Sequence, residues 1–227
     1  MGKWIIIISI AVLAIVAGCT TDPEMATFTI TIEVLPGSTT PIAPLAWAVH
    51  SGDNPLYTPD TMDRINGLEA LAEDGDPSTV AASLMSLSEV AMSGSASIPV
   101  GMGSPAPAGP GESYSFNFSA TEGEMLAFAT MFVQSNDLFY GPAISSIDLF
   151  PGGNPVSGDI TGQINLYDAG TEVNEEPGVG PNQAPRQTGP NTGPDENGSV
   201  LLISDVSDGF TYPAVADIIK VTVTAMQ

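Results

Sequence analysis

Two acidic clusters carry the side chains that are best suited to binding a metal ion. Ser135, Asn136 and Asp137 follow one strongly apolar segment, and Asp168 and Glu172 follow another. A glycine between Asp168 and Glu172 allows the backbone to curl there. Calcium takes about six to eight oxygen ligands from carboxylates and backbone carbonyls. The residues alone leave two interpretations open, a calcium site and acids that are simply solvated at the surface.

Residues that usually perform catalysis are scarce. His50 is the only histidine, so a Ser-His-Asp triad would have to use it, and one histidine cannot supply the nitrogen ligands of a usual zinc site. Its position at the end of an apolar stretch is equally expected of a histidine that caps a sheet edge. A hydrolase with paired carboxylates stays open as an alternative, because the chain has 26 acidic residues. We expect a protein that is not an enzyme.

The amino terminus has the pattern of an exported lipoprotein. An apolar run from Trp4 to Val16 is shorter than the roughly 20 residues that span a bilayer. It leads into Ala17-Gly18-Cys19, which resembles the lipobox of prokaryotic lipoproteins. We expect a signal peptide at 1–19, a spacer at 20–25 and one domain at 26–227. Acylation of Cys19 would tether this domain to the cell membrane on its extracytoplasmic side, at the cell surface or in the periplasm.

The charge is strongly negative, with 26 acidic residues against four basic ones and a net charge of −22. Nucleic acid is excluded as a partner, since binding it requires cations that displace the counterions of the phosphates. The domain after Cys19 contains no cysteine, so it forms no disulfide. Its stability must therefore come from its core, with help from a metal ion if one binds.

The segments that must position the acidic clusters are mostly strands. Alternating polar and apolar residues predict half-buried strands, at 27–34, 113–119, 160–167 and 219–224. An almost continuous apolar run at 125–133 predicts a central strand. Shorter strands are expected at 45–50, 144–150 and 200–203, and helices at 64–72 and 78–92, the second ended by Gly94. Seven or eight short strands with Gly/Pro turns predict a mostly β protein, an antiparallel β-sandwich with one or two short helices.

Taken together, these segments resemble the spondin domain, the amino-terminal module of F-spondin and mindin, which also occurs alone in prokaryotic secreted proteins. The matching stretches are 44–51, 67–75, 135–139 and 168–172, in the same order as in the family. The resemblance extends from about Ala26 to Thr224. Its most specific element is the Asp-Ala-Gly-Thr-acid sequence that starts at Asp168.

The resemblance implies a β-sandwich similar to C2 domains, with one calcium ion held by Asp137, Asp168 and Glu172. Animal members usually have Asp at the position of Glu172, and they have cysteines that this chain lacks. Because the animal module contributes to adhesion, the resemblance implies a module that binds a surface polymer, glycan or protein. An envelope hydrolase and a structural lipoprotein that captures cations weakly remain the alternatives.

Two sequons could accept N-glycans if the host modifies exported proteins. The first is Asn117-Phe118-Ser119, on the polar face of a predicted strand. The second is Asn197-Gly198-Ser199, in a long segment at 168–199 that has no periodicity. A segment of that length without regular structure is typical of functional or mobile loops.

Overall fold

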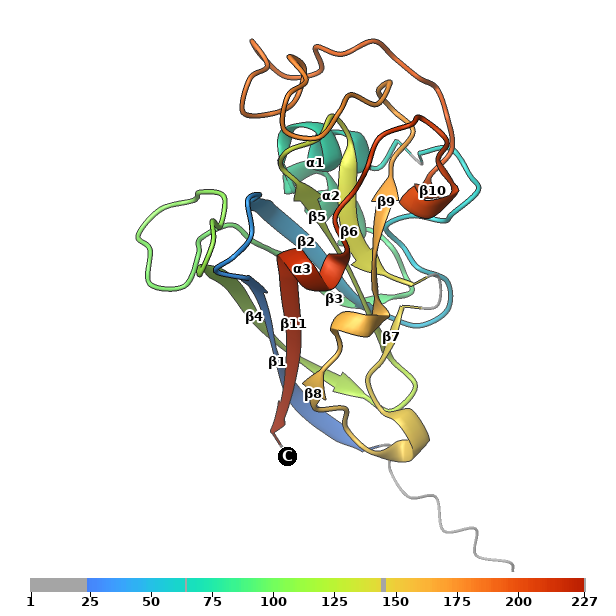
Figure 1. Cartoon of the computed structure of the whole chain (residues 1–227). Coiled ribbons are helices and arrows are strands. Elements are labelled where there is room, and N and C mark those ends of the chain that lie inside the picture. Colours follow the sequence, from blue (N-terminus) through green and yellow to red (C-terminus); the bar gives the residue numbers. More distant parts are fainter. Residues whose placement is uncertain (1–23, 64, 144–145, 227) are drawn as a thin grey trace, which may run out of the picture.

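The computed structural model describes residues 24–63, 65–143 and 146–226. The predicted signal peptide, the lipobox and Cys19 lie outside these residues, so the lipid anchor stays a prediction. Within the described ranges, eleven strands form two antiparallel sheets that pack against each other (Figure 1). The predicted fold class, a mostly β antiparallel sandwich with short helices, is confirmed.

The first sheet contains, in order, β4 (Ser113–Thr121), β1 (Met25–Val34), β11 (Ile219–Met226) and β8 (Gly158–Asp159). The second contains, in order, β10 (Leu201–Leu202), β9 (Ile164–Asp168), β6 (Leu138–Pro142), β5 (Met125–Phe132), β2 (Ile42–His50) and β3 (Val90–Ala96); β7 (Ile147–Asp148) also pairs with β5. The α-helices are α1 (Leu68–Asp74), α2 (Ser78–Leu84) and α3 (Val215–Ile218). Short 3-10 helices lie at Pro151–Gly153, Thr161–Gln163 and Ile203–Asp205.

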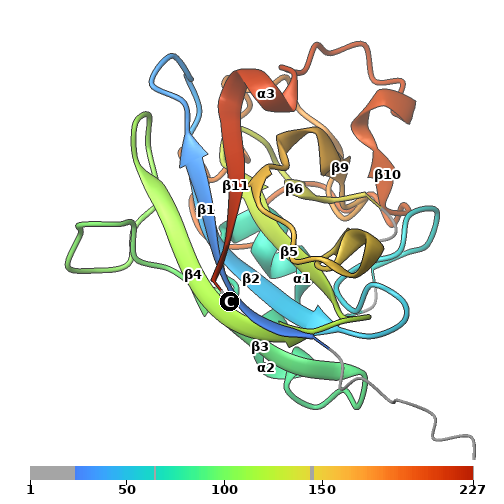
Figure 2. The same cartoon turned by 90° about the horizontal axis from the view of Figure 1, so that it is seen from below.

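The core between the sheets follows from the alternation of side chains along β1. Phe28, Ile30 and Ile32 are fully buried, whereas the threonines between them lie on the outer face. Burying each such apolar side chain contributes roughly 1.5–3 kcal/mol. Aromatic rings of the two sheets interlock, with Trp47 of β2 stacked on Phe116 of β4 at a centroid distance of 5.1 Å. Figure 2 shows β4, β1 and β11 as one layer and β2 and β5 as the next.

The second sheet is also covered on its other face. Ala46 and Ala48 of β2 and Ala127 and Ala129 of β5 form a separate cluster with apolar residues of α1 and α2. Small side chains at these positions let the helices lie close to the sheet. This arrangement explains why β5 has a nearly continuous apolar sequence, as expected for a central strand buried on both faces.

The helix predicted at 78–92 is wrong in its second half. The helix α2 ends at Leu84, and residues 90–96 form β3, which pairs with β2. Gly94, which the sequence pattern assigns to the end of that helix, lies in β3 against Trp47. A Cβ atom on Gly94 would come within 2.9 Å of the indole Cζ2. Pairing with β2 and packing on the indole therefore override the local helical spacing.

Other elements are also shorter than their patterns predict, among them β10, since the strand predicted at 200–203 covers only Leu201–Leu202. The helix α1 begins at Leu68 rather than at residue 64, because Gly67 before it is left-handed, with φ of 101°. The strand β9 begins at Ile164, since residues 161–163 form a 3-10 turn. Of the strand predicted at 144–150, only Ile147–Asp148 is a strand in the part of the chain that the structure describes.

The strands that lead to the predicted metal ligands end on the same side of the molecule. Asp137 lies in the turn between β5 and β6, and Asp168 is the last residue of β9. This side lies opposite to the start of β1 at Met25 (Figure 1). No helix in the described ranges combines the length and the apolar character that a membrane span requires.

Replacing Gly141 with Ala is expected to destabilise the fold. Gly141 lies in β6, where a Cβ atom would come 3.0 Å from the carbonyl oxygen of Phe128 and clash with the hydroxyl of Tyr57. Overpacking of this kind costs about 1–3 kcal/mol of unfolding free energy, measurable by urea denaturation. Gly162→Ala is the matched control, because no atom lies within 4 Å of its Cβ position. Equal stability of the two variants would contradict this packing.

Candidate metal centre

Three carboxylates meet at the loop end of the sandwich. One oxygen each from Asp137, Asp168 and Glu196 lies within 4.8 Å of the other two. Asp137 and Asp168 come together because β6 and β9 are neighbours, with Leu138 opposite Asp168 in the register. The structure therefore brings together two of the three residues expected from the sequence, and it adds Glu196.

Glu196 reaches this cluster because residues 169–200 between β9 and β10, the long loop, fold back so that their last residues pair with their first. The N–H of Glu196 donates to the carbonyl of Thr171 at 2.9 Å, and the N–H of Gly198 donates to the carbonyl of Gly170 at 2.7 Å. Gly170 has φ of 70°, and a Cβ atom there would lie 2.6 Å from the carbonyl oxygen of Ser199. Only glycine at position 170 allows the first residues of the loop to approach Gly198 and Ser199 this closely.

The turn that carries Asp137 is held by side-chain hydrogen bonds. The Ser135 hydroxyl donates to the carbonyl of Phe132 at 2.6 Å and accepts the N–H of Leu138 at 3.1 Å. The Oδ2 atom of Asp137 accepts the N–H groups of Thr171 at 2.8 Å and Glu172 at 3.1 Å. These contacts tie the β5–β6 turn to the start of the long loop.

The other oxygen of Asp137 has no such partner. Asp137 is fully buried, and among the described residues no hydrogen-bond donor reaches its Oδ1 atom. Burial raises the pKa of Asp137 well above its usual range, and the nearby charge of Asp168 raises it further. A buried acceptor without a partner is costly, and a cation bound at this point would remove that cost.

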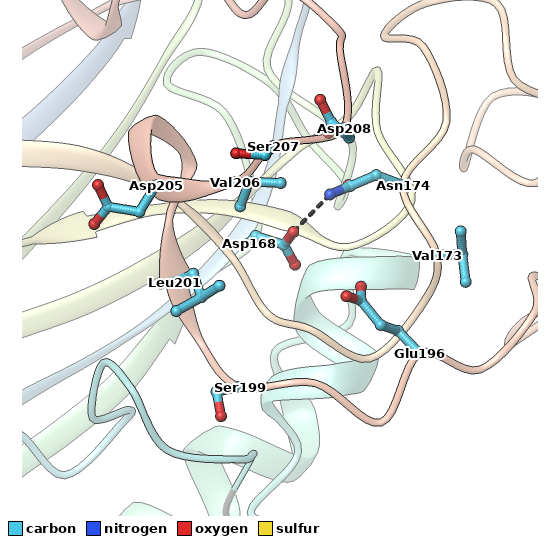
Figure 3. A pocket seen from close by; sticks show the side chains of 10 residues that line it. All are labelled: Asp168, Val173, Asn174, Glu196, Ser199, Leu201, Asp205, Val206, Ser207 and Asp208. Atoms are coloured by element: carbon cyan, nitrogen blue, oxygen red, sulfur yellow. Dashed lines mark hydrogen bonds between the residues drawn. The ribbon is translucent and has the colours of Figure 1, made fainter.

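Asp168 is better supplied with donors. Its Oδ1 atom accepts the N–H of Gly170 at 2.6 Å, and its Oδ2 atom accepts the side-chain amide of Asn174 at 2.6 Å (Figure 3). Burial raises the pKa of Asp168, and these two hydrogen bonds oppose part of that rise. The structure describes two basic residues, Arg186 and Lys220. The guanidinium of Arg186 donates to the carbonyl of Gly180 and to the side chains of Gln134 and Gln183. Lys220 lies in β11, in the other sheet. Neither of these two neutralises the cluster.

Glu172 is buried next to this cluster but has a different set of partners. Its Oε1 atom accepts the N–H of Gly193 at 2.8 Å, and its Oε2 atom accepts the amide of Asn136 at 3.3 Å. Its carboxylate is not among the three that converge. Glu172 thus joins Gly193, near the end of the long loop, to Asn136 in the β5–β6 turn. Its role as a metal ligand stays a prediction.

The sequence patterns do not single out Glu73, a fourth buried carboxyl group. It lies in α1, is 2% exposed, and its Oε2 atom has no hydrogen-bond partner among the described residues. Burial raises the pKa of Glu73 to about 8; the hydrogen bond with Thr171 lowers it, and the charge of Glu172 raises it. Its helix resembles any other short amphipathic helix, so no local signal separates Glu73 from the half-buried acids Glu69 and Asp74.

A cavity of about 330 Å³ opens at this cluster, and Figure 3 shows the residues that line it. Two members of the cluster, Asp168 and Glu196, belong to its lining. Asn174 and Asp208 line it as well, and apolar side chains of the loop complete the wall. The cluster is therefore accessible from one side through this cavity, and its third member, Asp137, is fully buried.

The other residues selected from the sequence lie elsewhere. The Nε2 atom of buried His50 is 2.9 Å from the Ser146 hydroxyl, and burial lowers the pKa of His50. Asn117 is exposed on β4 and accepts the hydroxyl of Thr29 at 2.6 Å. Asn197 is exposed in the long loop with φ of 58°. Glycosylation of Asn117 and Asn197 stays a prediction.

Comparisons of the chain with protein-family models and with curated protein sequences find no match. The resemblance to the spondin domain therefore depends on the sequence stretches quoted above. The buried acidic cluster is an independent observation, since it comes from the geometry of the fold alone.

Glu73→Gln is expected to flatten the pH dependence of stability of the metal-free protein. Between pH 4.5 and about 8, the folded Glu73 retains a proton that the unfolded chain has released. The wild-type unfolding midpoint, measured with a chelator, should therefore fall as the pH rises through this window. The unfolding midpoint of Glu73→Gln should fall less over the same pH range. Glu69→Gln, on the half-exposed side of α1, should show the same fall as wild type. Identical slopes for wild type and Glu73→Gln would refute the burial of this charge.

Proposed function

We propose that the protein is a calcium-binding module, similar to the spondin domain, that is held at the extracytoplasmic side of a membrane by lipid on Cys19. It would bind a surface polymer, glycan or protein rather than catalyse a reaction. The observation that supports this proposal is the convergence of Asp137, Asp168 and Glu196, together with the buried Oδ1 atom of Asp137, which has no donor among the described residues.

The donor set suits calcium. Asp137, Asp168 and Glu196 offer only carboxylate oxygens, and calcium prefers hard oxygen ligands in a flexible geometry, whereas zinc and copper prefer nitrogen and sulfur. A bound calcium ion would supply the positive charge that this end of the molecule lacks. Through Glu196, it would also connect the long loop to the turn and strand that carry the two aspartates.

The position of the site suits a surface module. The metal centre and the long loop lie at the opposite end of the sandwich from Met25, the start of β1 (Figure 1). An anchor at Cys19 would hold the protein close to Met25, so the calcium end would be directed away from the membrane. Distance from an anionic bilayer also reduces its repulsion of this acidic protein.

The alternatives have less support. A hydrolase with paired carboxylates would need both groups in reach of a substrate, but Asp137 is fully buried. A weak cation trap would use scattered, exposed acids, whereas one defined cluster with a buried member favours a single tighter site. Calorimetry separates these cases, because a cation trap would show many weak sites for calcium.

Calcium is expected to stabilise the protein against heat. A hundredfold excess over Kd raises the unfolding free energy by about 2.7 kcal/mol, or roughly 5–10 °C in Tm. Asp168→Asn and Glu196→Gln should remove most of this rise. Glu122→Gln, in the exposed turn before β5, is the control and should respond like wild type. No response of the wild type to calcium would defeat the proposal, and a response lost in Glu172→Gln but kept in Glu196→Gln would reassign the third ligand.

Calcium should also protect the long loop from trypsin. Apart from Lys3, the chain has three basic residues, and exposed Arg186 lies in the long loop. If Glu196 binds calcium, the loop opens less often, and cleavage that produces a fragment starting at Gln187 should slow roughly tenfold or more. Mass spectrometry identifies that fragment, and Glu196→Gln should be cut at the same rate with calcium and with chelator. Equal cleavage of the wild type under both conditions would show that calcium does not close the loop.

A further inference from the structure

The cavity beside the metal centre has a lining that selects for one kind of ligand. We propose that it binds a neutral sugar ring of a glycan, with two adjacent hydroxyl groups of the ring completing the coordination of calcium. This inference rests on the proposed calcium site and names the class of partner that the site takes.

The cavity and the metal cluster share residues. Asp168 and Glu196 belong to both, so a ligand in the cavity lies next to the cation position. The fully buried Asp137, whose Oδ1 atom lacks a donor among the described residues, belongs to the same cluster on the interior side. The fold brings one oxygen of each of the three carboxylates together, which leaves at least three of the about six to eight oxygen positions of calcium to other ligands. Because Asp168 and Glu196 also line the cavity, a ligand there would be within reach of the positions that the protein does not fill.

The size of the cavity suits a small ligand. Its volume of about 330 Å³ is at the low end of the range for small-molecule sites, which is roughly 300–1,000 Å³. Apolar side chains from both sides of the cavity, Val173, Leu201 and Val206, contribute to the wall (Figure 3). These side chains can pack against the C–H groups of a sugar ring.

The polar part of the lining is rich in hydrogen-bond acceptors. Asp205 and Asp208 add two carboxylates to those of Asp168 and Glu196. Ionised carboxylates accept hydrogen bonds and donate none. The lining also includes Asn174, Ser199 and Ser207, whose amide and hydroxyl groups donate, but its four carboxylates favour a ligand that brings donors of its own.

A hydroxyl group can bind calcium and donate a hydrogen bond to the wall at the same time. Its oxygen lends a lone pair to calcium, and its hydrogen donates to a carboxylate of the wall. An ammonium group has donors but no lone pair for the metal. A carboxylate ligand has lone pairs but no donor, and it meets the charges of four acidic side chains around the cavity. Among common surface groups, the neighbouring hydroxyls of a neutral sugar fit best.

The test uses the whole chain, purified in detergent, and beads coated with mannan, dextran or galactan as neutral glycans. Alginate beads and polylysine beads represent anionic and cationic partners. Wild type should be retained on at least one neutral glycan in calcium and released by a chelator. Ser207→Trp places a large ring at an exposed position of the wall and should lower binding roughly tenfold or more while the calcium-induced rise in Tm persists. Ser204→Trp, at an exposed serine outside the lining, is the matched control and should bind like wild type.

The outcomes separate the two proposals. A calcium-dependent rise in Tm without retention on any of the three neutral glycans overturns the sugar proposal and leaves the calcium site standing. Retention on alginate or polylysine alone, or retention that survives the chelator, overturns it as well. If calcium does not change Tm, the calcium site fails and the sugar proposal fails with it.

Discussion

Buried negative charge at one end of the sandwich constrains the rest of the structure. Glu73, Asp137, Asp168 and Glu172 are all nearly inaccessible to water. A charged carboxylate loses several kcal/mol of hydration in such a place unless hydrogen bonds, a retained proton or a cation compensates. Backbone and amide donors serve Asp168 and Glu172, and the raised pKa of Glu73 reflects a retained proton. Burial raises the pKa of Asp137 as well, and its Oδ1 atom has no donor among the described residues, so a retained proton or a bound cation must compensate there.

The long loop depends on the same carboxylates for its shape. It contains neither helix nor regular strand between β9 and β10, so little apolar burial holds it. The first and last residues of the loop are paired by backbone hydrogen bonds, and the carboxylate of Glu172 accepts the N–H of Gly193 near the end of the loop. Within the loop, Glu175 accepts the side-chain amide of Asn182 at 2.7 Å. A cation at Asp137, Asp168 and Glu196 would therefore act on the folding of this loop as well as on its charge.

The sandwich supplies the rigidity that such a site needs. The register between β6 and β9 sets the separation of Asp137 and Asp168, and the stacked rings of Phe139 and Tyr167 in the same two strands resist rearrangement. The alternation of residues in β1 and β4 was sufficient to predict these strands, because a period of two encodes one buried face. It failed for β3, where a short, half-buried strand has apolar residues that also fit a helical spacing.

The sequence by itself determined the fold class and the two aspartates of the candidate site. Strand periodicity is local, and an acid that directly follows a buried strand is carried to the strand end with little freedom. Only the tertiary structure decided that Glu196 joins Asp137 and Asp168, that Glu172 binds Gly193 and Asn136, and that Glu73 is buried. Those outcomes depend on where a long loop without regular structure returns and on how a helix packs against the sheet. Contacts between residues distant in the chain set both, and a local pattern of side chains does not encode them.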